Sequence, residues 1–243
     1  MKFAVISDIH GNMFALNAVL NDIKSQNIDK IYCLGDLAMA GPEPNKTVNF
    51  VKNQNWTVIQ GNTDNMIVNY SEDLYKKVHD NASIMANALK LDVEEISPEN
   101  KEFLKNLPEQ KSIEIEGVKI LLVHGSPRKN DENIFPNLSM EKIEEIVQNV
   151  EESVIFCGHT HIPCGYQTES QKTIVNVGSV GRPFTEKPDA CYVIAEVANG
   201  ELLVEHKMID YDRVSASNIL SERNFDGANN LAQMLIKPET RHM

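Results

Sequence analysis

The chain has 243 residues, of which 42% are hydrophobic and 24% are charged, and its formal net charge is −12. This length is enough for one large domain with its own core, so we treat residues 1–243 as a single domain. The acidic balance excludes a surface that coats nucleic acid, because such a surface needs clustered lysine and arginine. It does not exclude a small phosphorylated substrate, since bound cations reverse the sign of the local field.

The chain shows no sign of a membrane segment or of a disulfide framework. No apolar run reaches the length of a membrane span, and the first residues lack the apolar region of a signal peptide. The four cysteines, Cys33, Cys157, Cys164 and Cys191, form no CxxC pair, and all but Cys164 lie in apolar runs. We therefore expect reduced core thiols and a cytoplasmic protein. Nothing in the sequence indicates an oligomeric state.

The first sixty residues alternate between strand and helix patterns. Strands are expected at 3–7 (FAVIS), 30–35 (KIYCLG) and 56–61 (WTVIQG). Apolar residues at helical spacing predict a helix over 14–23, and Pro44 is well placed to begin a second one. This βαβαβ order predicts a parallel sheet.

The middle of the chain changes character. Residues 65–110 are rich in charge and in helix formers, which predicts a helical excursion that forms a wall or lid over the site. SIEIEG and VKILLVHG (112–125) form an expected hairpin that turns at Glu116-Gly117. A helix over 139–150 and a strand in SVIFCG follow.

The last third is rich in strand patterns. We expect strands in CGYQTE (164–169), KTIVNVG (172–178), ACYVIAEV (190–197) and ELLVEHKMI (201–209). They predict a second, more antiparallel sheet packed on the first. A C-terminal helix is expected at about 213–235, with a break at Gly227, and the end from Lys237 is expected to fray.

Side chains that could bind a metal follow five of the expected strands. They are Asp8, His10, Asp36, Asn62, His124, His159 and His161. Ligands of open α/β sheets bind in clefts beyond the strand ends, and a mixture of imidazole and carboxylate suits divalent transition metals. Seven ligands are too many for one ion, so the pattern predicts two ions that share a ligand.

Each motif is a weak signal by itself. An isolated Asp-x-His is most often a surface turn, Asp36 could be a helix N-cap, and Asn62 could be a left-handed turn residue. The pair in Gly158-His159-Thr160-His161 is the strongest single element. The recurrence of such motifs at five strand ends favours a dinuclear site. Asp36, with two carboxylate oxygens, is the candidate bridge.

The order of these motifs resembles the calcineurin-like metallophosphoesterase superfamily. The strings SDIHGN, CLGDLAMAGPEPN, HGSPR, GHTHIP and NVGSVGRP are similar to its small prokaryotic phosphodiesterase branch, over about residues 1–200. The resemblance implies an α/β fold, a four-layer α/β/β/α sandwich of two mixed sheets, with the metals at the rim between them.

The resemblance also implies a ligand set and a reaction. One ion would be held by Asp8, His10, Asp36 and His161. The other would be held by Asp36, Asn62, His124 and His159. A metal-bridging hydroxide would attack phosphorus in line. Manganese is the expected ion, although iron, nickel, cobalt and zinc suit the same ligands.

The chain departs from many relatives at one catalytic position. Where they have histidine, followed by an acidic residue, this chain has Thr63 followed by Asp64, and we take these two as candidate catalytic residues. Threonine donates a hydrogen bond but is no useful acid near neutral pH. Esters with acidic leaving groups are therefore the expected substrates. His79, in the helical excursion, is an alternative proton donor.

Asn12, Arg128 and Arg182 are the candidate contacts to a phosphoryl group, two of them through guanidinium groups. The favoured function is a two-metal phosphoesterase that hydrolyses diesters, and monoesters less well. One alternative is a pyrophosphohydrolase of dinucleoside polyphosphates or nucleotides. Another is a non-catalytic metal-binding scaffold that grips a partner protein.

Overall fold

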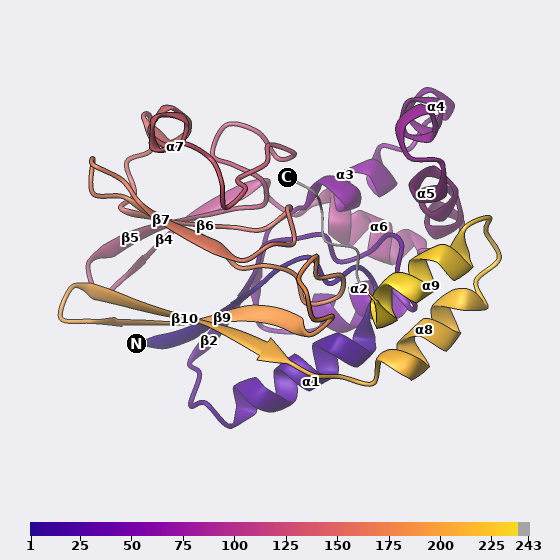
Figure 1. The fold of residues 1–243 in the computed structure, drawn as a ribbon, viewed down its shortest axis with the longest axis horizontal. Coiled ribbons are helices and arrows are strands. Elements are labelled where there is room, and N and C mark those ends of the chain that lie inside the picture. Colours follow the sequence, from indigo (N-terminus) through magenta and orange to yellow (C-terminus); the bar gives the residue numbers. More distant parts are fainter. Residues whose placement is uncertain (238–243) are drawn as a thin grey trace.

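The computed structural model describes residues 1–237, and its strands form two five-stranded sheets (Figure 1). The first sheet consists, in spatial order, of β10 (Glu201–Ile209), β9 (Ala190–Ala198), β1 (Lys2–Ile6), β2 (Lys30–Cys33) and β3 (Thr57–Val58). The second consists of β4 (Gln110–Ile115), β5 (Val118–Val123), β6 (Val154–Cys157), β8 (Thr173–Asn176) and β7 (Cys164–Gln167). Both sheets are mixed.

The βαβαβ unit predicted at the N-terminus is present. Strands β1, β2 and β3 are parallel, and α1 (Met13–Lys24) and α2 (Pro44–Lys52) connect them. The third strand is shorter than WTVIQG suggested. The hairpin of β4 and β5 is also present, and β5, β6 and β8 are parallel.

The expectation that the strands after His161 form a sheet of their own is wrong. β7 and β8 join the second sheet, whereas β9 pairs antiparallel with β1, and β10 pairs with β9. The first six residues of β9 are all buried, which is the signature of a central strand. Pairing with β9 removes an edge that β1 would otherwise expose.

Alternating side chains of β1 build two of the three cores. Phe3 and Val5 point between the sheets, whereas Ala4 and Ile6 point to the outer face of the first sheet, where α1 packs. A third core lies between the second sheet and α7 (Met140–Val147). The predicted order of helix, sheet, sheet and helix is therefore confirmed.

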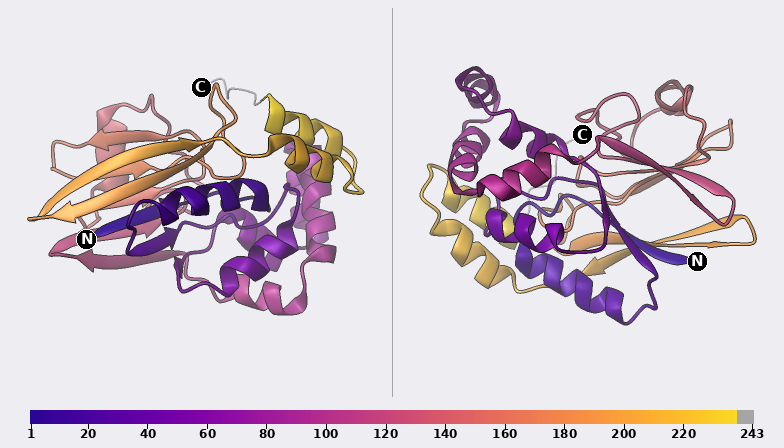
Figure 2. Two further views of the ribbon diagram at one scale, coloured as in Figure 1. Left: turned by 90° about the horizontal axis from the view of Figure 1, so that it is seen from below. Right: turned by 180° about the vertical axis from the view of Figure 1, so that it is seen from behind.

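The remaining helices gather at one end of the sheets, as Figure 2 shows from two further directions. The predicted excursion consists of α3 (Asn62–Val68), α4 (Glu72–Asn81), α5 (Ser83–Glu95) and α6 (Pro98–Lys105). The predicted C-terminal helix is two helices, α8 (Arg213–Ser221) and α9 (Ala228–Ile236). Gly227 separates them with a φ of 99°.

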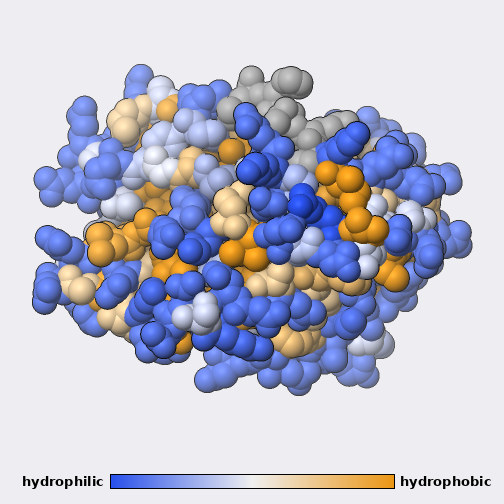
Figure 3. Space-filling view, turned by 60° about the horizontal axis from the view of Figure 1, so that its bottom comes forward, coloured by the Kyte–Doolittle hydropathy of each residue, from blue (hydrophilic) through white to orange (hydrophobic). Residues whose placement is uncertain are grey.

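Cys33, Cys157 and Cys191 are buried and unpaired, as expected. Of the predicted frayed end, residues 238–243 lie outside the described residues. Within residues 1–237, no helix is long and apolar enough to cross a membrane. Figure 3 shows a face on which hydrophobic side chains form several small groups separated by hydrophilic ones.

Candidate metal centre

The seven predicted ligands come together at the edge where strands of both sheets end. Backbone hydrogen bonds connect the loops that carry them. The His10 N–H donates to Asp36 O at 2.9 Å, and the Gly158 N–H donates to His124 O at 2.8 Å. The ligands of each sheet are therefore fixed to one another through the main chain.

Many of the ligands have an unusual backbone conformation. Positive φ angles, between 47° and 66°, occur at Asp8, His10, Asp36, His159 and His161. Such angles in residues other than glycine cost on the order of 1–3 kcal/mol each and cluster at functional sites. Here the strained residues are the ones whose side chains point towards a common centre.

Glycines next to the ligands leave room for carboxylates. A Cβ atom on Gly61 would lie 2.0 Å from Oδ1 of Asp36. One on Gly158 would lie 2.2 Å from Oγ of Ser7 and 2.5 Å from Oδ2 of Asp8. The glycines that precede Asn62 and His159 are therefore required sterically, because any side chain there would collide with these carboxylates.

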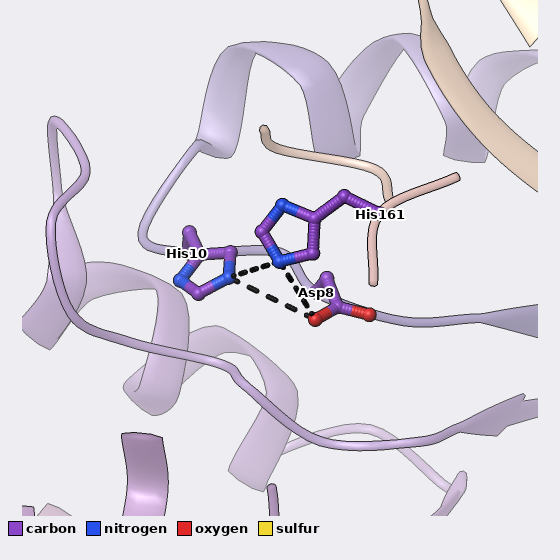
Figure 4. A group of neighbouring side chains, drawn as sticks. All are labelled: Asp8, His10 and His161. Carbon is purple, nitrogen blue, oxygen red and sulfur yellow. Dashed lines mark hydrogen bonds and ion pairs between the residues drawn. The ribbon is translucent and has the colours of Figure 1, made fainter. Parts of the chain in front are cut away.

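Asp8, His10 and His161 form one ligand group (Figure 4). Nε2 of His161 lies 3.1 Å from Oδ1 of Asp8 and 3.1 Å from Nε2 of His10. Nε2 of His10 is 3.6 Å from Oδ2 of Asp36. Three side chains from two loops thus aim ligand atoms at one point.

The second group consists of Asp8, Asp36 and His124, lies beside the first and shares Asp8 with it. Nε2 of His124 is 3.4 Å from Oδ2 of Asp36, 3.9 Å from Oδ1 of Asp8 and 2.9 Å from Oδ1 of Asn62. The ring of His159 lies 5.3 Å from that of His124, centroid to centroid. Asp36 is thus in contact with both groups, as a bridging ligand must be.

Main-chain carbonyls fix the tautomers of three histidines. Nδ1 of His10 lies 3.0 Å from Met39 O, Nδ1 of His124 lies 2.8 Å from Leu34 O, and Nδ1 of His161 lies 2.6 Å from Arg182 O. An Nδ1–H that donates to a carbonyl leaves Nε2 as a lone-pair donor. No sequence signal reveals these carbonyls, because their direction depends on the folded loops.

The point where Asp8, His10 and His161 meet lacks hydrogen-bond donors, and this is the test of whether it suits a cation. Two bare Nε2 atoms face each other across 3.1 Å, and Oδ1 of Asp8 is buried without a hydrogen-bond partner. Converging acceptors repel one another unless a cation lies between them. The nitrogen and carboxylate donor set suits divalent transition metals.

The titration of the ligands reflects this crowding. Burial lowers the pKa of His10 to about 4, with a further contribution from His161. Burial would raise the pKa of Asp8 and of Asp36, but the imidazoles around them outweigh it, so the pKa of Asp36 falls to about 2. Despite burial, Asp36 and Asp8 raise the pKa of His124 to about 10.

The two candidate catalytic residues begin α3 beneath Asp36. The Thr63 N–H donates to Oδ1 of Asp36 at 2.9 Å, and Thr63 Oγ1 donates to Ala38 O at 3.1 Å. Asp64 is fully buried and accepts hydrogen bonds from the N–H groups of Gly61 and Leu37. Burial, with Asp36 adding to it, raises the pKa of Asp64 to about 7. Asp64 thus supports the loop, while Thr63 faces the cavity.

A cavity of about 230 Å³ opens on the centre. Its metal-binding side includes Asn62 and His159, and Thr63 lies beside them. Its other lining residues are Met39, Met66, Val78, Met85, Arg182 and Phe184, which are apolar except for Arg182. The predicted wall is therefore real, because Val78 belongs to α4 and Met85 to α5. The charge-rich sequence of residues 65–110 gave no indication that this wall is apolar.

Only one of the three predicted phosphate contacts lines this cavity. Arg182 does, with its guanidinium carbon 5.5 Å from the centroid of the Phe184 ring, which stacks on His161. Arg128 instead lines a separate cavity of about 150 Å³ and pairs with Glu132 and Glu145.

Asn12 and His79 lie away from the cavity. Asn12 is fully buried, caps α1 through the Ala15 N–H, and donates to Gly181 O and to the Tyr211 hydroxyl. An asparagine directly before a helix is a strong N-cap signal that could have been recognised. The contact of Asn12 with substrate stays a prediction that this geometry does not favour. His79 is exposed on α4.

Comparison with known proteins agrees with this geometry. Residues 1–200 match the calcineurin-like phosphoesterase superfamily domain. The chain belongs to this superfamily. An uncharacterized protein from Methanocaldococcus jannaschii is 33% identical to this chain over 226 residues, which cover 86% of this chain and 87% of the relative.

Two solved structures share the whole fold of this calcineurin-like phosphoesterase. A hypothetical protein of Pyrococcus horikoshii superposes with a TM-score of 0.85 at 25% identity, covering 98% of this chain and 99% of that one. A metallophosphoesterase of Sphaerobacter thermophilus superposes with a TM-score of 0.76, also at 25% identity, covering 97% and 98%. Both matches extend beyond residue 200.

Proposed function

We propose that this protein hydrolyses phosphodiesters with the help of two divalent cations, manganese being the expected one. The observation that carries the proposal is the donor-free convergence of Asp8, His10 and His161 beside Asp36 and His124. In a phosphoesterase family, such a centre serves the hydrolysis of a phosphorus–oxygen bond. Two ions would share Asp36, and this would explain why the centre offers seven ligands.

Divalent ions at such a centre make water more acidic and neutralise the charge that develops on the phosphoryl oxygens. The chain itself orients the atoms that would bind these ions. Fixed tautomers keep Nε2 of three histidines directed inward, and the Thr63 N–H holds one oxygen of Asp36 so that the other faces both histidine groups. Arg182 lies at the cavity wall, where its positive charge suits a phosphoryl oxygen.

The cavity favours diesters over monoesters. A monoester carries more charge at neutral pH, whereas a diester adds an organic group that can lie against the apolar wall of Met66, Val78 and Met85. Thr63 offers no proton to the leaving group of the ester near neutral pH, since its hydroxyl is no useful acid. Esters of acidic alcohols therefore suit this site best.

Turnover of bis(p-nitrophenyl) phosphate by protein loaded with manganese tests the proposal. We expect steady hydrolysis that chelation abolishes and that His161→Ala reduces strongly. p-Nitrophenyl phosphate, measured in parallel, should react more slowly. Tight manganese binding without turnover of either ester, or of dinucleoside polyphosphates, would instead support the scaffold function.

A further inference from the structure

The C-terminal helix pair is joined to the loop beneath the metal centre through one arginine. Arg223 follows α8, and only 6% of its side chain is exposed. Its Nη1 donates to Gly41 O at 2.9 Å. Its Nη2 donates to Oδ1 of Asp92 at 2.6 Å and to Oε2 of Glu95 at 2.5 Å. A single guanidinium thus connects α8, α5 and the loop after β2.

Asp92 continues this connection from within α5. It is fully buried, and while Oδ1 pairs with Arg223, Oδ2 accepts the N–H of Ala40 at 3.0 Å. Met39 and Ala40 have positive φ angles of 78° and 64°. Two successive residues in this region are costly for side chains other than glycine, so the turn persists only if its surroundings hold it. Asp92 and Arg223 hold the turn in place through their hydrogen bonds to Ala40 and Gly41.

The turn, in its place, holds a metal ligand. Met39 O lies 3.0 Å from Nδ1 of His10 and fixes the tautomer that directs Nε2 to the centre. The next residues pack against the same ligand, since a Cβ atom on Gly41 would lie 1.5 Å from His10 O. A shift of residues 39–41 would therefore move both the ring and the backbone of His10.

We propose that Arg223 is a positioning residue for His10, and that the α8–α9 pair thereby sets the geometry of one cation site. The proposal rests on the proposed function only in needing the two cations of that centre. Arg223 and both helices lie beyond residues 1–200, the segment that matches the superfamily. The centre thus depends on a part of the chain outside that segment.

The charge of Arg223 is as important as its reach. Removing the guanidinium leaves Asp92 buried without its partner, and an unpaired buried carboxylate is unstable. The carboxylate then takes up a proton or draws in water, and in either case its hydrogen bond to Ala40 weakens. Lysine in place of Arg223 keeps the charge but cannot bond Gly41 O and both carboxylates in one plane.

Calorimetric titration of the full chain with Mn²⁺ tests the proposal. Arg223→Met should weaken one of the two binding steps by roughly 10–100-fold, the range found when partners that support metal ligands are removed, and leave the other nearly unchanged. Arg223→Lys should recover part of the loss. Asp92→Asn, which keeps an oxygen for Ala40, should also weaken that step.

A matched control lies on the same helix. Arg213 begins α8, and its ion pairs are with Asp189 and Asp210 instead of with the turn at residues 39–41 or with Asp92. Arg213→Met should leave both binding steps unchanged. An equal loss in Arg213→Met, or an equal loss in both steps of Arg223→Met, would show a general loosening of the fold and overturn the proposal.

A double-mutant cycle with His10→Ala identifies the ligand through which Arg223 acts. If Arg223 works through His10, then Arg223→Met should add little to His10→Ala, because coupled residues give non-additive losses. Additive losses would overturn the proposal, as would unchanged Mn²⁺ affinity in Arg223→Met. If Arg223→Met does not fold, the cycle with Arg223→Lys gives the same decision. Since the readout is metal affinity, a protein that hydrolyses no diester refutes only the proposed function.

Discussion

Three of the four histidines at this centre depend on a carbonyl as much as on their own rings. Met39 O, Leu34 O and Arg182 O each face the Nδ1 atom of one imidazole, so that Nε2 is left to bind a cation. The histidines could be identified from the sequence, because they follow strands in a recurring pattern. The carbonyls could not, because any residue type provides one. Residue identity therefore predicts the ligand atoms, and the fold determines their direction.

Asp36 should matter more than any neutral ligand. It lies 3.6 Å from Nε2 of His10 and 3.4 Å from Nε2 of His124, so it can balance the charge of both ions. We expect Asp36→Asn to reduce turnover beyond the roughly 10–100-fold loss typical of supporting partners, and Asn62→Ala to cost less. Rates of both variants at saturating manganese measure this. Equal losses would refute Asp36 as the bridge.

Thr63 should make the reaction sensitive to the leaving group. Its hydroxyl already donates to Ala38 O and is no useful acid, so the departing oxygen must stabilise its own charge. We expect a steep fall in rate across aryl diesters of rising phenol pKa. Thr63→His should flatten this dependence, with gains that can reach on the order of 10² for the poorest leaving groups.

The same series of phenols can also contradict the role assigned to Thr63. If the wild-type rate does not depend on phenol pKa, then another group donates the proton or chemistry is not rate-limiting. Thr63→Ser is the matched control, since it keeps a hydroxyl and should leave the slope unchanged. A slope that changes equally in Thr63→Ser and Thr63→His would remove the assigned role.

At the scale of elements, local patterns predicted more than pairings did. Helices and strands with clear periodicity, such as those over 2–24, are present with ends shifted by a few residues. The assignment of β9 and β10 was wrong because the partner of β9 is β1, with Lys2 opposite Glu196. No local pattern encodes a pairing across that distance. The meeting of the ligand-bearing strand ends at one edge could still be predicted, because the ligand motifs directly follow those strands in the sequence.

Glycine at a motif is an element-scale requirement that can be tested. A methyl group at Gly158 would collide with Ser7 and Asp8, at 2.2 Å and 2.5 Å, and push β6 away from β1 where the ligands meet. We expect Gly158→Ala to abolish tight metal binding and to cost about 1–3 kcal/mol of stability, as overpacking does. Metal analysis and thermal unfolding of the variant measure both effects.

Gly165, in β7, provides the matched control. The nearest atom to a Cβ there is Ile174 O at 3.7 Å, an ordinary contact. Gly165→Ala should keep full metal content and change stability little. If Gly158→Ala retained two tightly bound ions, the close approach of β6 to Asp8 would not be what requires glycine.

For the molecule as a whole, the centre is a buried concentration of like charge. Asp8 and Asp36 are both buried and ionised, in a chain whose net charge is −12. Without cations they are compensated by the proton on His124, whose pKa is about 10. A cation must displace that proton, because only the neutral imidazole binds a metal. Folding, proton binding and metal binding are therefore linked.

This linkage predicts how stability depends on metal and pH. Metal analysis should approach two ions per chain, and manganese at about 100 times its Kd should add about 2.7 kcal/mol per site. For a chain of this length, that raises Tm by roughly 5–10 °C per site. Chelation should reverse the increase, and a plateau at one ion would refute the dinuclear centre.

The pH dependence follows from the raised pKa of His124. Its ordinary pKa of 6.5 rises to about 10 on folding, so the stability it contributes is present below pH 6.5 and is lost as pH rises towards 10. Over the same range, cations compete with fewer protons and bind more tightly. The difference in Tm between manganese-loaded and chelated protein should therefore widen from pH 7 to pH 9. Thermal unfolding across this range measures it, and a constant difference would mean that cation binding releases no proton from His124.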